Sequence, residues 1–252
     1  MNRYLKNLDR IEFVVTMGCT GRCKHCSEVS HVFAGEHIDG ETAAKAVTEV
    51  CRHYDIKSLM TFGGEPLLFP EAVCSIHRAA AEASIKHRDV ITNGFFSTDR
   101  QRIREVAEML AKSGVNRIML SVDAFHQETI PLEPVDHFAE CVREAGVFIE
   151  LHPAWLVSAE DRNPYNSKTT ELIGFFAEKG FSADSGNVIF PKGSALKYLL
   201  EYFDGNTVQS DPYEEDPEDI RSLCFEADGS VLGGNIYSSD IMDIIEVYTA
   251  VK

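Results

Sequence analysis

The sequence predicts an α/β protein, a partial (β/α)6 TIM-like barrel followed by a small α+β extension. Short apolar runs rich in β-branched or aromatic residues alternate with segments of helical period, which indicates strand–helix units and a parallel sheet. The units repeat at roughly thirty residues, the length of one strand, one helix and two short loops. Six such units are fewer than the eight of a closed barrel, so we expect the barrel to be incomplete.

The six expected strands cover residues 11–16, 58–62, 89–92, 117–122, 147–152 and 187–190. The helix before the fourth strand has its apolar residues at spacings that place them on one face. These residues are Ile103, Val106, Ala107 and Leu110. Gly114 follows this helix as its expected C-terminal cap, and Gly146 and Gly180 end the next two units in the same way.

The pattern changes after Ala195, where we expect the barrel core (1–195) to give way to an extension (196–252). Residues Asp211–Asp219 are acidic and contain two prolines, which is typical of a solvated loop. Residues Leu223–Leu232 predict a hairpin that turns at Asp228–Gly229, and a short helix is expected over Ser239–Tyr248.

The charge and hydropathy of the chain exclude several classes of protein. The sequence has 24 Lys and Arg against 40 Asp and Glu, a net charge of -16, which repels phosphate backbones and makes nucleic acid an unexpected partner. The first ten residues are polar, and the sequence has no apolar run long enough to span a membrane. We therefore expect a cytoplasmic protein without a membrane partner.

Three of the seven cysteines, Cys19, Cys23 and Cys26, lie within eight residues directly after the first strand. In a reducing compartment such crowding favours metal ligation over disulfides. Thiolates are soft ligands that suit iron–sulfur clusters, and three of them on a cluster of four irons leave one iron open for a small molecule. A zinc site that lacks one ligand, or three incidental thiols in a buried loop, are the alternatives.

The segment Met17–Cys26 resembles the CxxxCxxC signature of the radical S-adenosylmethionine (SAM) superfamily, including the aromatic His25 before the last cysteine. In that family the three cysteines bind a 4Fe-4S cluster, and the open iron takes the amino and carboxylate groups of SAM. Thr61–Leu67 contains Gly63, Gly64, Glu65 and Pro66 and resembles the family's GGEP motif, which holds the methionyl ammonium. Glycines allow a close backbone approach, and a carboxylate pairs with a cation.

Further segments at strand ends resemble family positions that contact the cofactor. They contain Asn93 after the third strand and Ser121 and Asp123 at the fourth; loop capping is the alternative role for such residues. Pro191–Ala195 resembles the P-x-G-x-A segment that often closes the family core, so the resemblance covers about residues 9 to 195. Barrel enzymes build their sites at the carboxyl ends of the strands.

The resemblance implies that the reduced cluster cleaves SAM to give a 5′-deoxyadenosyl radical, which abstracts hydrogen from a peptide or protein substrate. A small-metabolite substrate, an activase for a glycyl-radical enzyme, and an iron–sulfur redox sensor or binding protein are the alternatives. The resemblance also implies that a protein such as flavodoxin or ferredoxin donates the electron. His126 is a candidate for substrate binding or proton transfer, or else a loop histidine. The same alternatives apply to His152, which ends the fifth strand.

The C-terminal segment resembles a reduced form of the SPASM or twitch extension that peptide-modifying members of the family carry. The full form uses several extra cysteines for auxiliary clusters, whereas only Cys224 is present here. We therefore expect a single cluster. Cys224 is a candidate hydrogen-atom donor to a product radical, with a core cysteine as the alternative.

Overall fold

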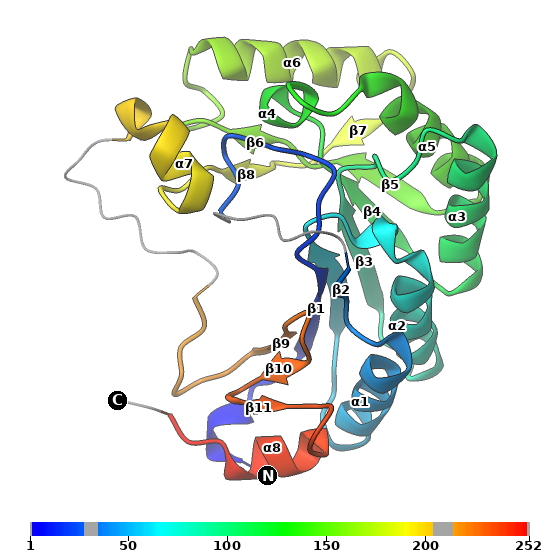
Figure 1. Cartoon of the computed structure of the whole chain (residues 1–252), viewed down its shortest axis with the longest axis vertical. Coiled ribbons are helices and arrows are strands. Elements are labelled where there is room, and N and C mark those ends of the chain that lie inside the picture. Colours follow the sequence, from blue (N-terminus) through cyan, green and yellow to red (C-terminus); the bar gives the residue numbers. More distant parts are fainter. Residues whose placement is uncertain (1, 28–34, 204–213, 251–252) are drawn as a thin grey trace.

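The computed structural model describes residues 2–27, 35–203 and 214–250. Its main sheet has seven strands in the order β7-β5-β4-β3-β2-β1-β9, and every neighbouring pair is parallel. The strands are β1 Arg10–Thr16, β2 Ser58–Gly63, β3 His87–Thr92, β4 Arg117–Leu120, β5 Phe148–Leu151, β7 Ser182–Ala183 and β9 Ser222–Phe225. The sheet curves without closing, which confirms the partial barrel (Figure 1).

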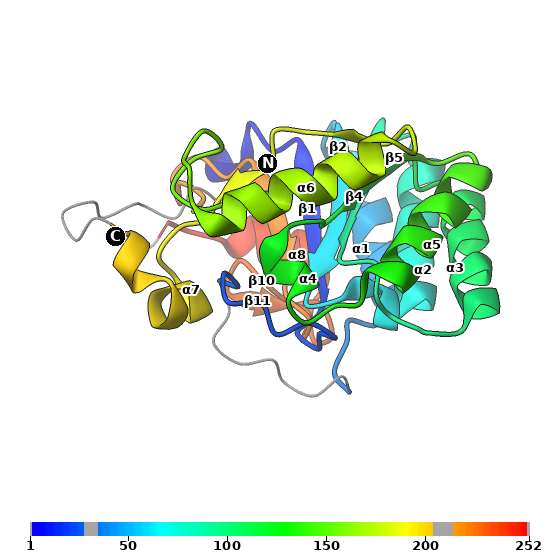
Figure 2. The same cartoon turned by 90° about the horizontal axis from the view of Figure 1, so that it is seen from above.

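The long helices lie on the outer side of this sheet, as Figure 2 shows for α2, α3 and α5. They are α1 Gly40–His53, α2 Pro70–Glu82, α3 Arg100–Lys112, α5 Leu132–Glu144 and α6 Pro164–Ala177. Three shorter helices are α4 Ala124–Gln127, α7 Gly193–Tyr198 and α8 Ile241–Val247. No helix in the described ranges is both long and apolar enough to cross a membrane.

The apolar face and the C-terminal glycine expected for α3 are confirmed by the structure, which also shows how the helix begins. The Asp99 side chain accepts a hydrogen bond from the backbone N–H of Gln101 and so caps the start of the helix. The four apolar residues expected on one face are the buried residues of α3. Gly114 has φ +87° directly after the helix, a conformation that glycine adopts without the steric cost of a side chain.

The prediction that residues 187–190 form the sixth strand of the main sheet is wrong. That place is taken by β7, and β8 (Asn187–Val188) pairs instead with β6 (Ala154–Trp155) in a separate two-stranded sheet. The chain turns between β7 and β8 at Gly186, which has φ +64°, and the Asp184 carboxylate accepts its N–H. The turn carries the apolar run away from the main sheet.

The C-terminal segment adds an edge to the main sheet, because β9 pairs with β1 in the register Arg10↔Ser222. The Phe13 and Phe225 rings stack across this pair with centroids 4.5 Å apart. The predicted turn at Asp228–Gly229 is present, since Gly229 donates to the carbonyl of Glu226. However, the antiparallel pair is β10 (Ser230–Val231) with β11 (Gly234–Asn235), whereas β9 pairs in parallel with β1.

Of the predicted acidic loop, residues 214–219 form a mostly exposed segment without a helix or strand. Residues 211–213 lie outside the described residues. The division at residue 195 remains a prediction, and the shared sheet shows that the two parts are packed into one another.

Candidate active site

The loop after β1 and the carboxyl ends of the central strands surround a cavity of about 260 Å³. Ten of the residues proposed from the sequence line it: Cys19, Cys23, His25, Cys26, Gly63, Gly64, Asn93, Ser121, Asp123 and His126. They are spread over more than 100 positions of the chain. The parallel strands bring them together because their carboxyl ends meet at one edge.

The two glycines at the end of β2 allow the cysteine loop to lie directly on the strand. A Cβ on Gly64 would lie 2.2 Å from the carbonyl oxygen of Gly18, and a Cβ on Gly63 would lie 2.4 Å from that of Thr16. The N–H of Gly64 donates to the Thr16 carbonyl at 2.7 Å. Glycine is therefore required here by a backbone-to-backbone contact that fixes the start of the cysteine loop.

The three thiols converge in a sheltered environment. Burial raises the pKa of Cys19 to about 11 and raises that of Cys23 further, so these groups become thiolates when a bound metal displaces their protons. The Cys19 sulfur accepts hydrogen bonds from the Gly21 N–H at 3.4 Å and from the Asn93 amide at 3.6 Å, which stabilise negative charge on it. Three soft donors in this setting fit an iron–sulfur cluster.

Apolar residues from distant segments cover the cysteine loop. Cys23 belongs to a buried cluster with Phe125, Ala154, Leu156, Ile189, Ala195 and Leu199. The N–H of Ser194 donates to the carbonyl of Cys26 at 2.9 Å. The segment Pro191–Ala195 therefore packs against the loop, where it helps to keep water away from the thiols.

Asp123 organises one wall of the cavity. Its carboxylate accepts the backbone N–H groups of Phe125 and His126 at the start of α4 and the Nδ1–H of His126 at 2.7 Å. Burial favours the protonated acid, but His126 outweighs this effect and holds the pKa of Asp123 well below its usual range. Asp123 is consequently an ionised, fully buried carboxylate that orients the His126 ring.

His25, from the cysteine loop, contacts the His126 ring of this pair. Its ring packs against those of His126 and Phe125, with centroids 4.8 and 5.1 Å away. Burial lowers the pKa of His25 to about 4, so the ring is neutral. One possible ligand atom from each of Cys23, His25 and His126 lies within 4.8 Å of the others, so both imidazoles face the cysteine side of the cavity.

A comparison of the sequence with protein families identifies the family of the chain. Residues 13–147 match the Radical SAM superfamily, which is more than half of the 252 residues. The chain belongs to the radical SAM superfamily. It is an enzyme that uses a 4Fe-4S cluster and SAM.

Curated relatives of this radical SAM enzyme have low sequence identity to it. The GTP 3′,8-cyclase of Desulforamulus reducens is 25% identical over 162 residues, covering 62% of this chain and 48% of the relative. The probable GTP 3′,8-cyclase of Saccharolobus islandicus is 27% identical over 163 residues, with 62% and 49% covered. The chain thus spans about half the length of the curated relatives it matches.

Solved structures support the same fold over almost the whole chain. The structure of anSMEcpe with bound AdoMet has a TM-score of 0.61 at 16% identity, covering 95% of this chain and 77% of that one. Streptococcus suis SuiB bound to the precursor peptide SuiA has a TM-score of 0.56 at 13% identity, with 96% and 65% covered. At these identities the likeness shows the radical SAM fold.

Glu65 and Pro66 of the radical SAM core lie behind the cavity and do not line it. The Glu65 carboxylate accepts hydrogen bonds from the Leu67 N–H, the Thr92 hydroxyl and the Asn93 N–H at 2.7 to 2.9 Å. It thereby ties the end of β2 to the end of β3 and places Asn93 at the cavity. Contact between Glu65 or Pro66 and the cofactor remains a prediction.

The stability of the protein should fall between pH 5 and pH 8 through Glu65. Burial raises the pKa of this carboxyl from 4.5 to about 7, so the folded state holds a proton that the unfolded chain releases between these values. The stabilisation contributed by Glu65 is complete below pH 4.5 and is lost as pH rises through 7, a loss of about 3 kcal/mol from this group. Urea unfolding at pH 5 and pH 8 measures the decline, and Glu65→Gln should lack it. The same pH dependence in both proteins would show that Glu65 is ionised throughout.

The opposite wall contains His152, for which the sequence suggested the same roles as for His126, and Asn187, which sequence reasoning missed. His152, at the end of β5, lies with Nδ1 2.8 Å from the Asp184 carboxylate and Nε2 2.8 Å from the Asn187 amide. His152 and Asn187 line the cavity. His152 was a candidate because it ends a strand, whereas Asp184 and Asn187 lie in the part of the chain where the strand prediction is wrong.

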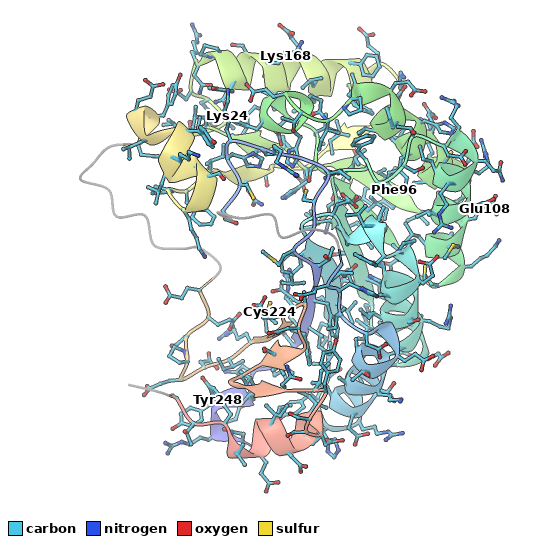
Figure 3. The ribbon with its side chains drawn as sticks, viewed as in Figure 1. Lys24, Phe96, Glu108, Lys168, Cys224 and Tyr248 are labelled. Atoms are coloured by element: carbon cyan, nitrogen blue, oxygen red, sulfur yellow. The ribbon has the colours of Figure 1, made fainter. Side chains whose placement is uncertain are left out.

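The structure does not bring Cys224 to the cysteine triad. It lies on β9 opposite Glu12 (Figure 3), four residues before the end of β1, which corresponds to about 13 Å along a strand. Cys224 does not line the cavity. Burial raises the pKa of its thiol to about 12, so the sulfur carries its hydrogen at neutral pH.

Proposed function

We propose that this radical SAM enzyme abstracts a hydrogen atom from a residue of a peptide or protein, in a modification such as epimerisation or cross-linking. The observation that carries the proposal is the arrangement of the cysteine triad and the polar strand ends around one cavity with an unpaired strand edge beside it. When bound, the reduced cluster and SAM supply a 5′-deoxyadenosyl radical that takes the hydrogen atom.

The residues of the chain have separate parts in this proposal. Cys19, Cys23 and Cys26 hold the cluster. Gly63, Gly64, Asn93, Ser121, Asp123 and His25 would hold SAM, and Glu65 and Pro66 would contribute to the same site from the end of β2. His126 faces the cavity with its ring fixed by Asp123, which suits it to substrate binding or proton transfer. Cys224 is proposed to donate a hydrogen atom if the product radical reaches β9.

The edge of β8 supports a peptide substrate. The N–H groups of Asn187 and Ile189 donate to the carbonyls of Pro153 and Trp155 in the β6 segment, so the backbone groups of Val188 point to the other side. Among the described residues β8 pairs only with β6. An extended peptide can add to such an edge through backbone hydrogen bonds, and Val188 lies at the cavity.

A small metabolite is the second candidate substrate, and the curated relatives favour it because they are GTP 3′,8-cyclases. The two candidates also share the proposed electron donor, a flavodoxin or ferredoxin. A nucleotide substrate requires positive charge near its phosphates. The lining of this cavity instead includes a buried carboxylate, Asp123, which favours the peptide.

The test is anaerobic turnover of the enzyme reconstituted with iron and sulfide. We expect dithionite and SAM to give 5′-deoxyadenosine, and peptides encoded by neighbouring genes to increase its release and to show a mass or stereochemical change. GTP, assayed in parallel, should not increase the release. Stimulation by GTP alone would replace the peptide with a metabolite, and no release under any condition would contradict the enzymatic proposal.

A further inference from the structure

A group of charged side chains lies on the inner faces of β3, β4 and β5 and directly after β7. We call these residues, Asp89, Arg117, Glu150 and Asp184, the inner wall. Along each of these strands the residues next to them in sequence, Val90, Ile118, Ile149 and Leu151, are buried in the core under the helices. Side chains alternate between the two faces of a strand. The inner wall therefore faces the barrel interior.

One arginine serves three carboxylates in the inner wall. The Arg117 guanidinium lies 2.7 Å from Glu150, 3.6 Å from Asp89 and 3.7 Å from Asp184. Three negative charges against one positive charge leave an excess of two when His152 is neutral. A charge excess in a partly desolvated site favours a cation that can enter it.

Asp89 is the member of the inner wall with unused hydrogen-bonding capacity. Asp89 is 7% exposed. Its Oδ2 atom faces Arg117, whereas its buried Oδ1 atom has no hydrogen-bond partner among the described residues. Buried carboxylate oxygens rarely lack a partner. Burial raises the pKa of Asp89, although Arg117, His87 and Arg10 oppose this effect.

The inner wall is directly connected to the cavity. Ile91 and His152, which line the cavity, follow Asp89 and Glu150 by two residues on the same strand faces, a distance of about 7 Å. The Asp184 carboxylate contacts both the cavity lining and the inner wall, since it lies 2.8 Å from His152 and 3.7 Å from Arg117. The side chains of Arg117, Glu150 and Asp184 are 33%, 15% and 18% exposed, so a ligand group can reach them.

We propose that the inner wall binds a cationic organic group of the substrate, a primary ammonium or guanidinium, and so selects substrates that carry one. This deepens the proposed function and rests on it, because the bound group would lie below the cavity that holds the cofactor. An organic cation fits better than a metal ion, since among the described residues only Cys23, His25 and His126 have the spacing of a metal site. An ammonium can also donate to three carboxylates beside a retained arginine.

The test measures binding of a defined probe to the cluster-loaded enzyme under saturating S-adenosylhomocysteine, which keeps the cofactor cavity filled. Dansylcadaverine, which carries a primary ammonium, is compared with its neutral N-acetyl derivative by fluorescence anisotropy. We expect the ammonium probe to bind at least ~10-fold more tightly, a difference of about 1.4 kcal/mol. Glu150→Gln and Asp89→Asn should each reduce that preference severalfold, whereas Glu105→Gln on the exposed face of α3 should leave it unchanged.

The outcomes separate this inference from the proposed function. Equal affinity for both probes, or a preference that survives Glu150→Gln and Asp89→Asn, overturns the cation site. Release of 5′-deoxyadenosine by the same preparation without added substrate shows independently that the radical machinery is intact. Circular dichroism of each variant identifies a misfolded protein, and Glu150→Asp, which retains the charge, should restore part of the preference in a folded one.

Discussion

Replacing Cys23 with alanine should abolish 5′-deoxyadenosine release, the largest effect expected of any single substitution in this chain. Cys23 is one of three thiols at the cavity and the one buried in the apolar cluster with Phe125. Without it the cluster has two protein ligands and loses the enclosure that Cys23 provides. We expect the rate to fall at least ~100-fold, which corresponds to about 2.7 kcal/mol in the barrier.

The matched control for this prediction is Cys51→Ala. Cys51 is a partly buried cysteine on α1 that does not line the cavity, so its removal should leave iron content and SAM cleavage near the wild-type level. Iron and sulfide per chain, the visible absorption of the cluster, and 5′-deoxyadenosine by chromatography are the measurements. A Cys23→Ala protein that retains four irons and cleaves SAM would remove Cys23 from the ligand set.

The cysteine site was predictable because its signal is local. Cys19, Cys23 and Cys26 are within one loop, and their spacing alone limits what they can bind. The polar residues at strand ends, such as Asn93 and Asp123, were proposed from the resemblance to the family, and the rule that parallel strands end at one edge predicts that they lie together. The apolar period that predicted the strands therefore also predicted where these side chains meet.

The parts that could not be predicted depend on which strands pair. The run at 187–190 has the composition of a core strand, but the turn at Gly186 diverts it to β6, and the poorly hydrophobic Ser182–Ala183 takes its place. Nothing near Ser222 indicates that this segment extends the sheet beside β1. The inner wall was hidden for the same reason, because Asp89, Arg117 and Glu150 become neighbours only through the register of three strands.

Gly64→Ala should detach the cysteine loop from the sheet and lower both stability and cluster content. The added Cβ would lie 2.2 and 2.6 Å from the carbonyl oxygen and carbon of Gly18 and 2.9 Å from the carbonyl oxygen of Met17. These are backbone atoms at the start of the loop that carries Cys19, so relief of the clash must move the ligand loop. We expect a loss of about 3 kcal/mol in the free energy of unfolding and less than half of the wild-type iron.

Two other glycines separate this clash from the general effect of a Gly→Ala substitution. Gly174 lies within α6 with nothing near its added Cβ, so Gly174→Ala should stabilise the protein by about 0.5–1 kcal/mol. Gly146 has φ +81° but also has open space, so Gly146→Ala should cost about 1–2 kcal/mol through backbone strain alone. Urea unfolding and iron analysis of the three variants give the comparison. Since only Gly64 contacts the cysteine loop, only Gly64→Ala should lose iron. An iron-replete Gly64→Ala protein would mean that the loop binds its cluster without support from β2.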